Sequence, residues 1–338
     1  MDLQQRTRRF GLAVIACAMV VRIFASGLPE TLTSRLKELD IAPFLIYLET
    51  GRDVRFSSSK EVFWLFSPES APPISPKKNH EPDKPAFSAE DTSLTDIYYA
   101  CALRPSLDEL LPSSLDWDLA DGQPAVLILH THTTESYTQT YENYVETSDY
   151  RTLDEDYNML SIGQKVADIL ENNGIIVLQD RDLHDYPSYN GSYADARKSI
   201  EYYLTEYPSL RLVLDLHRDA SDGGNGQLRT EAVINGERSA QLMLVMGTNA
   251  SGQKHDNWQE NFALALKLQA QLERQAPGIT RPTILRAQRF NQDMSSGALL
   301  VEVGAAGNTH AEALRAAEEL AKAIVALSKG TQPQKIKN

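Results

Sequence analysis

The chain has 338 residues, of which 42% are hydrophobic and 23% are charged, a balance typical of a globular protein with room for about two domains. This composition excludes wholesale disorder, a collagen-like repeat and a polytopic membrane protein. Lys and Arg number 33 against 46 Asp and Glu, so the formal net charge is −13. We therefore expect no nucleic acid partner, because the chain has no excess of basic residues to hold phosphates.

An apolar run near the N-terminus predicts export or anchoring. Arginines at positions 6, 8 and 9 precede the uncharged run 10–21, which is the pattern of a signal peptide or membrane anchor. The run is shorter than the roughly 20 residues of a relaxed spanning helix, but a snorkelling Arg22 extends it to Ala25. We expect residues 1–26 to form a signal or single-pass anchor in the cell membrane, with the rest of the chain outside the cytoplasm. Cleavage of the segment stays open, and a buried amphipathic helix is the alternative.

A proline-rich stretch separates this segment from the main part of the chain. Residues 67–92 carry six prolines among Ser, Lys, Asp and Glu, a composition that buries too little apolar surface to offset the entropy of ordering. We expect an extracytoplasmic stalk over residues 27–119 that contains this linker, followed by the main folded domain over residues 120–330.

From residue 124 onward, short apolar runs alternate with longer helical patterns. The predicted strands are 125–129, 175–178, 210–216, 242–246 and 299–303. The predicted helices are 158–172, 193–205, 258–275 and 311–327. This alternation predicts an α/β fold with a mostly parallel twisted sheet and helices on both faces. Ligands of such sheets bind beyond the carboxyl ends of the strands, so polar residues at those ends are the first functional candidates.

Three strand ends carry residues that bind metals or move protons. His132 and Glu135 follow the first strand three positions apart, so a helical turn would place both side chains on one side. His217 follows the third strand, and two histidines with one glutamate are a donor set of zinc hydrolases, in which Zn²⁺ lowers the pKa of bound water to about 7. Glu302, in the last strand, can take that water's proton and pass it to a leaving nitrogen. His130 is an alternative ligand to His132, since residues i and i+2 of a strand share a face.

Other candidates are suited to contact a substrate. Arg218 can bind a carboxylate or an oxyanion, and an ion pair with a neighbouring aspartate is its alternative. Tyr189 lies in the aromatic-rich loop 186–193, which suits sugars or peptides unless it only anchors the loop. Asn291 can line the same groove or serve in a turn. The sequence contains no Gly-x-Ser-x-Gly motif, so a serine nucleophile is not expected.

Four stretches between about residues 124 and 327 resemble the stage II sporulation protein P family of endospore-forming Firmicutes. They are ILHTHTTESY, VLDLHRDA, NMLSIGQKVADILENNGI and RAQRFNQDMSSGALLVEVGAAGNTHAEA. The resemblance implies a fold like that of the zinc-dependent N-acetylmuramoyl-L-alanine amidases. It also implies a membrane-anchored peptidoglycan hydrolase, an amidase with endopeptidase activity, that works with the sporulation proteins D and M during engulfment.

The resemblance assigns roles to individual residues. It places His132, Glu135 and His217 as zinc ligands and Glu302 as the catalytic glutamate. In ordinary amidases of this fold the ligand glutamate lies further along the chain, where Glu155 falls here, but the TTESY spacing favours Glu135.

We therefore expect a zinc-dependent hydrolase that cleaves the N-acetylmuramoyl-L-alanine amide, with stem-peptide cross-links as a second class of bond. Two other functions fit the same residues. A zinc carboxypeptidase or peptidase would use the same donor set on proteins or stem peptides, whereas a non-catalytic wall-binding scaffold would keep the fold without the ion.

Overall fold

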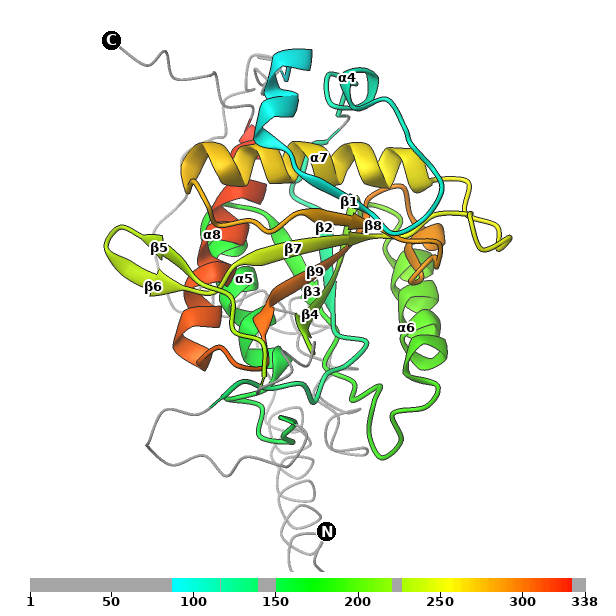
Figure 1. Cartoon of the computed structure of the whole chain (residues 1–338). Helices are drawn as coiled ribbons and strands as arrows, with labels where there is room; N and C mark the ends of the chain where they lie inside the picture. The colour runs from blue at the N-terminus through cyan, green and yellow to red at the C-terminus, as the bar shows by residue number, and fades with distance from the viewer. Residues whose placement is uncertain (1–86, 116, 139–149, 221–226, 330–338) are drawn as a thin grey trace, which may run out of the picture. The chain divides into compact units, whose positions relative to one another are not determined.

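The computed structural model of the chain describes residues 87–115, 117–138, 150–220 and 227–329 (Figure 1). These residues belong to one compact unit, Pro72–Asn338. The expected membrane segment, and the expected stalk up to residue 86, lie outside the described residues. Within the described part, no helix has the length and apolar character needed to span a bilayer.

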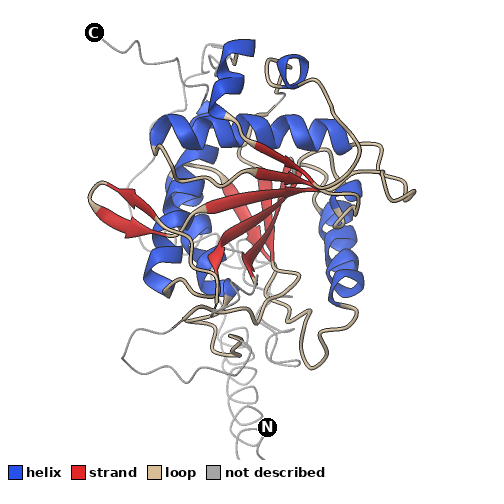
Figure 2. Cartoon of the chain, in the orientation of Figure 1, coloured by secondary structure: helices blue, strands red, loops and turns tan. Residues whose placement is uncertain are grey.

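A seven-stranded sheet forms the centre of this unit (Figure 2). From one edge to the other, its strands are β1 (Ile97–Tyr99), β8 (Thr283–Leu285), β7 (Leu242–Met246), β9 (Ala298–Ala305), β4 (Leu212–Asp219), β2 (Pro124–Leu129) and β3 (Ile176–Gln179). Every neighbouring pair is parallel except β7 and β9. The predicted mostly parallel sheet is confirmed.

Helices cover the two faces of the sheet unequally. One face packs against α5 (Met159–Asn172), α7 (Trp258–Gln275) and α8 (His310–Lys329) in the largest apolar core. The opposite face packs against α6 (Ser192–Glu206) in a smaller core that includes Leu127, Leu129 and Val213. Helices on both faces were predicted, but only one of the four long helices lies on this second face (Figure 2).

The longer predicted elements agree with the structure to within three residues at each end. Helix α5 begins where expected because Asn158 caps it: the Asn158 side-chain oxygen accepts the backbone N–H of Leu160 at 2.9 Å. The bounds of β7 and α7 coincide with the predicted ranges. The hairpin formed by β5 (Ala232–Ile234) and β6 (Glu237–Ser239) was not predicted.

The expected boundary at residue 120 is wrong. The 3₁₀ helix η2 (Ala89–Leu94), strand β1 and helix α4 (Leu107–Leu110) precede it and belong to the fold. Strand β1 pairs in parallel with β8, and Leu111 and Leu119 are fully buried in the largest core. The predicted strands β2, β3 and β7 are continuous apolar runs, whereas η2, β1 and α4 are short and mix polar with apolar residues, which is why the sequence did not reveal them.

Candidate active site

Strand register places the candidate acid beside a candidate ligand. His217 on β4 is the direct partner of Glu302 on β9, and Glu302 is in turn the partner of Met243 on β7. Alternate residues of β4 point to opposite faces, and Leu214 and Leu216 belong to the core under α5, α7 and α8. His217 therefore points to the face that carries α6, together with Glu302.

The structure places His132, Glu135 and His217 near one another. After β2 the chain makes a turn in which the Glu135 N–H donates to the His132 carbonyl at 3.1 Å. The His132 and His217 rings meet edge to face with centroids 5.2 Å apart. His217 Nδ1 lies 3.8 Å from Glu135 Oε2, and all three residues are buried.

This donor set fits zinc in its chemistry, and two of its three separations can be compared with those of a zinc site. Two ligand atoms on one tetrahedral zinc lie about 3.4 Å apart, and two imidazoles on it have ring centres roughly 5 Å apart. The separations of His217 from Glu135 and from His132 are close to these values. Among the residues that the structure describes, however, no three such side chains already converge as a metal centre.

Asp215 orients His217. Its Oδ1 lies 2.9 Å from His217 Nε2, and its two oxygens accept hydrogen bonds from the Thr131 N–H at 2.8 Å and the Thr131 hydroxyl at 2.6 Å. A carboxylate on the outer ring nitrogen is the usual support of a metal-binding histidine. It leaves His217 Nδ1 facing Glu135.

The site contains titratable groups with strongly shifted pKa values. Burial lowers the pKa of His132 to about 3, so its ring is neutral at pH 7. Burial also opposes protonation of His217, but the charge of Asp215 outweighs it and raises the pKa of His217 to about 9. A metal on His217 would displace this proton, because only the neutral imidazole is a ligand. Burial raises the pKa of Glu302 to about 8, with a further contribution from the charge of Glu135.

His130 does not join this cluster, which corrects its prediction as an alternative ligand. Its ring lies under α5, where Nδ1 contacts the Leu216 carbonyl at 3.1 Å and Nε2 contacts the Gln179 amide at 3.3 Å. A Cβ on Gly163 of α5 would fall 2.6 Å from that Nε2 atom. The i, i+2 argument fails because the strand ends at Leu129 and the chain turns before His132.

Glu155 also lies apart from the cluster. Its side chain is 58% exposed and forms an ion pair with Arg181. Glu135, by contrast, is only 4% exposed and accepts the backbone N–H of Arg218 at 3.1 Å. The geometry therefore favours Glu135 as the carboxylate of the cluster.

Arg218 supports the site from behind and is not placed to bind substrate. Its Nε donates to the Ser136 carbonyl at 3.0 Å and its Nη2 to the Tyr150 carbonyl at 2.9 Å. As the neighbour of His217 in β4, its side chain starts on the opposite side of the strand. We therefore correct the expectation that it binds a carboxylate or an oxyanion: it positions the segments that carry Glu135.

Aromatic side chains surround His132. The Tyr189 ring stacks on it with centroids 4.6 Å apart, and Tyr193 meets it edge to face at 5.6 Å. Tyr189 is 56% exposed, so one face of the site reaches solvent through this ring. Asn291 serves in a turn, which was the alternative to lining the groove. Its backbone has a φ of 57°, and its side-chain amide donates to the Tyr193 carbonyl at 2.7 Å.

Sequence reasoning missed Arg151, which links several parts of the site. Its guanidinium forms an ion pair with Asp185, lies 3.5 Å from Glu135 Oε1 and covers the Tyr189 ring at 4.8 Å from the centroid. The sequence around Arg151 contains no motif that predicts this role. Arg151 lies at the site because its backbone forms an isolated antiparallel bridge with that of Glu135, 16 positions earlier in the chain. Asp215 could have been found from the pattern, since it lies two residues before His217 and so shares its face.

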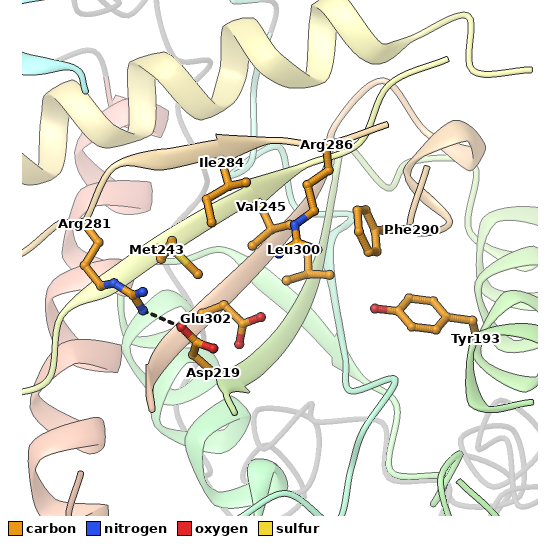
Figure 3. Close-up of a pocket in the computed structure, with 10 residues that line it drawn as sticks. All are labelled: Tyr193, Asp219, Met243, Val245, Arg281, Ile284, Arg286, Phe290, Leu300 and Glu302. Atoms are coloured by element: carbon orange, nitrogen blue, oxygen red, sulfur yellow. Dashed lines mark hydrogen bonds and ion pairs between the residues drawn. The ribbon is translucent and has the colours of Figure 1, made fainter. Parts of the chain in front are cut away.

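A pocket of about 310 Å³ adjoins the cluster and shares Glu302 with it (Figure 3). Strands β7, β8 and β9 form its floor, and Tyr193 of α6 lies at one side. Its lining residues are Tyr193, Asp219, Met243, Val245, Arg281, Ile284, Arg286, Phe290, Leu300 and Glu302.

The sequence of the chain matches the family model of stage II sporulation protein P (SpoIIP) over residues 64–325. The chain belongs to this family. It is 28% identical over 207 residues to the stage II sporulation protein P of Bacillus subtilis strain 168, a match that covers 58% of this chain and 49% of that protein. The aligned part thus spans about half the length of this relative.

Solved structures of two amidases are also similar to the chain. One is the N-acetylmuramoyl-L-alanine amidase AmiC2 of Nostoc punctiforme, with a TM-score of 0.36 and 15% identity over 61% of this chain and 96% of that one. The other is the CwlD amidase of Clostridioides difficile in complex with the GerS lipoprotein, with a TM-score of 0.38 and 13% identity over 61% and 95%.

Proposed function

We propose that the chain is a zinc-dependent peptidoglycan hydrolase that acts in sporulation. The observation that carries the proposal is the meeting of His132, Glu135 and His217, with Glu302 as the register partner of His217. Membership of the stage II sporulation protein P family supports the biological setting.

In this proposal His132, Glu135 and His217 hold the zinc ion. When bound, zinc supplies a Lewis acid for the substrate carbonyl and a water of lowered pKa. The chain's own contribution is to orient the donors: Asp215 fixes His217, while Arg218 and Arg151 hold Glu135.

Glu302 is the proton carrier of the reaction. Its Oε2 atom is buried and has no hydrogen-bond partner among the described residues, so it is available to a water or a substrate atom. Burial raises the pKa of Glu302 to about 8, and a cation held beside it would lower that pKa again, so that the carboxylate could take a proton and return it. Glu302 accepts a proton as the attacking oxygen forms its bond to the carbonyl carbon. It then gives that proton to the nitrogen as the C–N bond breaks.

The bond that we propose for cleavage is the amide between N-acetylmuramic acid and L-alanine, with stem-peptide cross-links as a second class of substrate. Residues 1–26 would hold the protein in the cell membrane, with the catalytic part on the outer side where peptidoglycan lies. The sporulation proteins D and M are the proposed partners.

Digestion of defined muropeptides by the full-length protein tests this function. We expect products with a free L-alanine amino group by mass spectrometry, and a loss of at least about 100-fold in rate for Glu302→Gln with zinc content and melting temperature retained. Glu319→Gln, which changes a buried acid on α8 outside the site, is the matched control and should keep full activity.

Each other outcome rejects part of the proposal. Release of terminal amino acids would indicate a carboxypeptidase. Full activity of Glu302→Gln would remove Glu302 from the reaction, and the absence of any product from a zinc-loaded protein would favour a wall-binding scaffold.

A further inference from the structure

Among the residues that the structure describes, the uneven cover of the sheet leaves a pocket with an apolar floor beside the catalytic cluster. Helix α6 packs over β2 and β4, and the face of β7, β8 and β9 carries a separate small apolar cluster. This cluster contains Met243, Val245 and Leu300, with Ile284 and Phe290 packed against it. Figure 3 shows these side chains beneath the pocket that Glu302 shares.

The pocket contains two arginines and two acids, but only one arginine is paired with an acid. At one end, Arg281 donates to Asp219 at 2.7 Å, which makes a neutral pair. At the other end, Arg286 is exposed and its guanidinium forms no hydrogen bond or ion pair with any described residue. Figure 3 shows the Arg286 side chain pointing over Val245 and Leu300 into the pocket. One guanidinium is therefore free to bind an anion above an aliphatic floor.

We propose that this pocket holds the leaving peptide of the substrate and that Arg286 recognises a free carboxylate of that peptide. The inference rests on the proposed function. In that function Glu302 gives its proton to the leaving nitrogen, so the first residue of the leaving peptide lies next to the Glu302 carboxyl group. The same carboxyl group lines one end of the pocket, so the pocket is placed to receive the rest of the peptide.

The chemistry of the lining selects a carboxylate on an aliphatic chain. A guanidinium binds a carboxylate through two parallel N–H···O bonds. These bonds are stronger here because the apolar floor excludes water from them. A phosphate would favour more than one free donor group, whereas Arg281 is already paired with Asp219. The volume of about 310 Å³ suits a fragment of one or two amino acids.

Kinetics with a pair of muropeptides test the assignment in the full-length protein. The two substrates differ only in that the peptide carboxylates are free in one and converted to primary amides in the other. We expect the wild type to prefer the free acid by about 10- to 100-fold in kcat/KM, the size of a charge-assisted hydrogen-bond pair. Arg286→Gln should lose this preference, Arg286→Lys should keep part of it, and Arg286→Glu should favour the amide.

Arg289→Gln is the matched control, because Arg289 follows the same strand and carries the same charge but pairs with Asp293 outside the pocket. It should keep the wild-type preference. Equal losses on both substrates in Arg286→Gln, or an unchanged preference, would overturn the subsite while leaving the hydrolase in place.

Binding measured by calorimetry separates the subsite from the proposed function. If the wild type cleaves neither substrate but binds the free acid more tightly, and Arg286→Gln abolishes this difference, the proposed reaction fails and the carboxylate site stands. If binding is equal for both substrates as well, the carboxylate site is also rejected.

Discussion

Glu135 is held from three directions, which separates it from Glu155. The Arg218 N–H donates to its Oε2, Arg151 approaches its Oε1 at 3.5 Å, and His217 lies beside it. A carboxylate with fixed orientation binds a metal with little loss of conformational entropy. Glu155, with an exposed side chain and an ion pair to Arg181, has no such restraint.

Substitution of these two glutamates distinguishes them directly. We expect Glu135→Gln in the full-length protein to lower zinc affinity at least about 10-fold, because an amide is a weaker and uncharged ligand. The matched variant Glu155→Gln should bind zinc as the wild type does. Zinc content after dialysis against a competing chelator gives the comparison. The opposite ranking would move the ligand to Glu155.

At the scale of the elements, the close approach of β9 to β4 depends on a glycine. A Cβ on Gly297 would lie 1.9 Å from the backbone carbonyl oxygen of Arg211, and the Gly297 carbonyl accepts the Val213 N–H at 2.9 Å. Any side chain here must separate the two strands that carry Glu302 and His217.

Gly297→Ala should therefore destabilise the protein by about 2–4 kcal/mol, since backbone must shift in a buried, packed region. Ser296→Ala, one residue earlier and exposed, should stay within about 0.5 kcal/mol. Urea unfolding measures both, and equal stabilities of the two variants would show that the strand contact is not as close as described.

The sequence was informative where a segment showed a long helical period or a continuous apolar run. Helix α7 and strand β7 were predicted to the residue, and the structure places His132, Glu135 and His217 near one another at the strand ends. Short elements such as β1 and β8 gave no period, and their pairing depends on contacts far apart in the chain.

The direction in which a side chain of the site points was harder to predict from the sequence than which chain segments lie close together. The turn that directly follows β2 sends His130 under α5, and the alternation of β4 sends Arg218 away from His217. Both outcomes depend on where a strand stops, which sequence patterns fix only to within a few residues.

At the scale of the whole unit, a buried lysine joins the N-terminal segment to α7. Lys267 Nζ donates to the Leu110 carbonyl and to the Ser113 hydroxyl, each at 3.0 Å. Burial lowers the pKa of Lys267 to about 8. Between pH 8 and 10.5 the unfolded chain therefore binds more protons at Lys267 than the folded chain does. The contribution of Lys267 to the free energy of unfolding consequently rises with pH over this range.

We expect the free energy of unfolding of the wild type, relative to Lys267→Met, to rise by about 1–2 kcal/mol between pH 7.5 and 10. In Lys322→Met the same comparison should stay flat over this range, because ion pairs with Glu318 and Glu319 raise the pKa of Lys322 against the effect of burial. Urea unfolding at several pH values provides the test. A flat difference for Lys267→Met would contradict the burial of its charge.

The zinc-edge X-ray absorption spectrum of the full-length protein loaded with one equivalent of zinc tests the central claim most directly. We predict two imidazole nitrogens and a carboxylate oxygen in the first shell, lost in His132→Gln and His217→Gln but kept in His130→Gln. A spectrum with sulfur ligands, or one that changes in His130→Gln and not in His132→Gln, would contradict the proposed site.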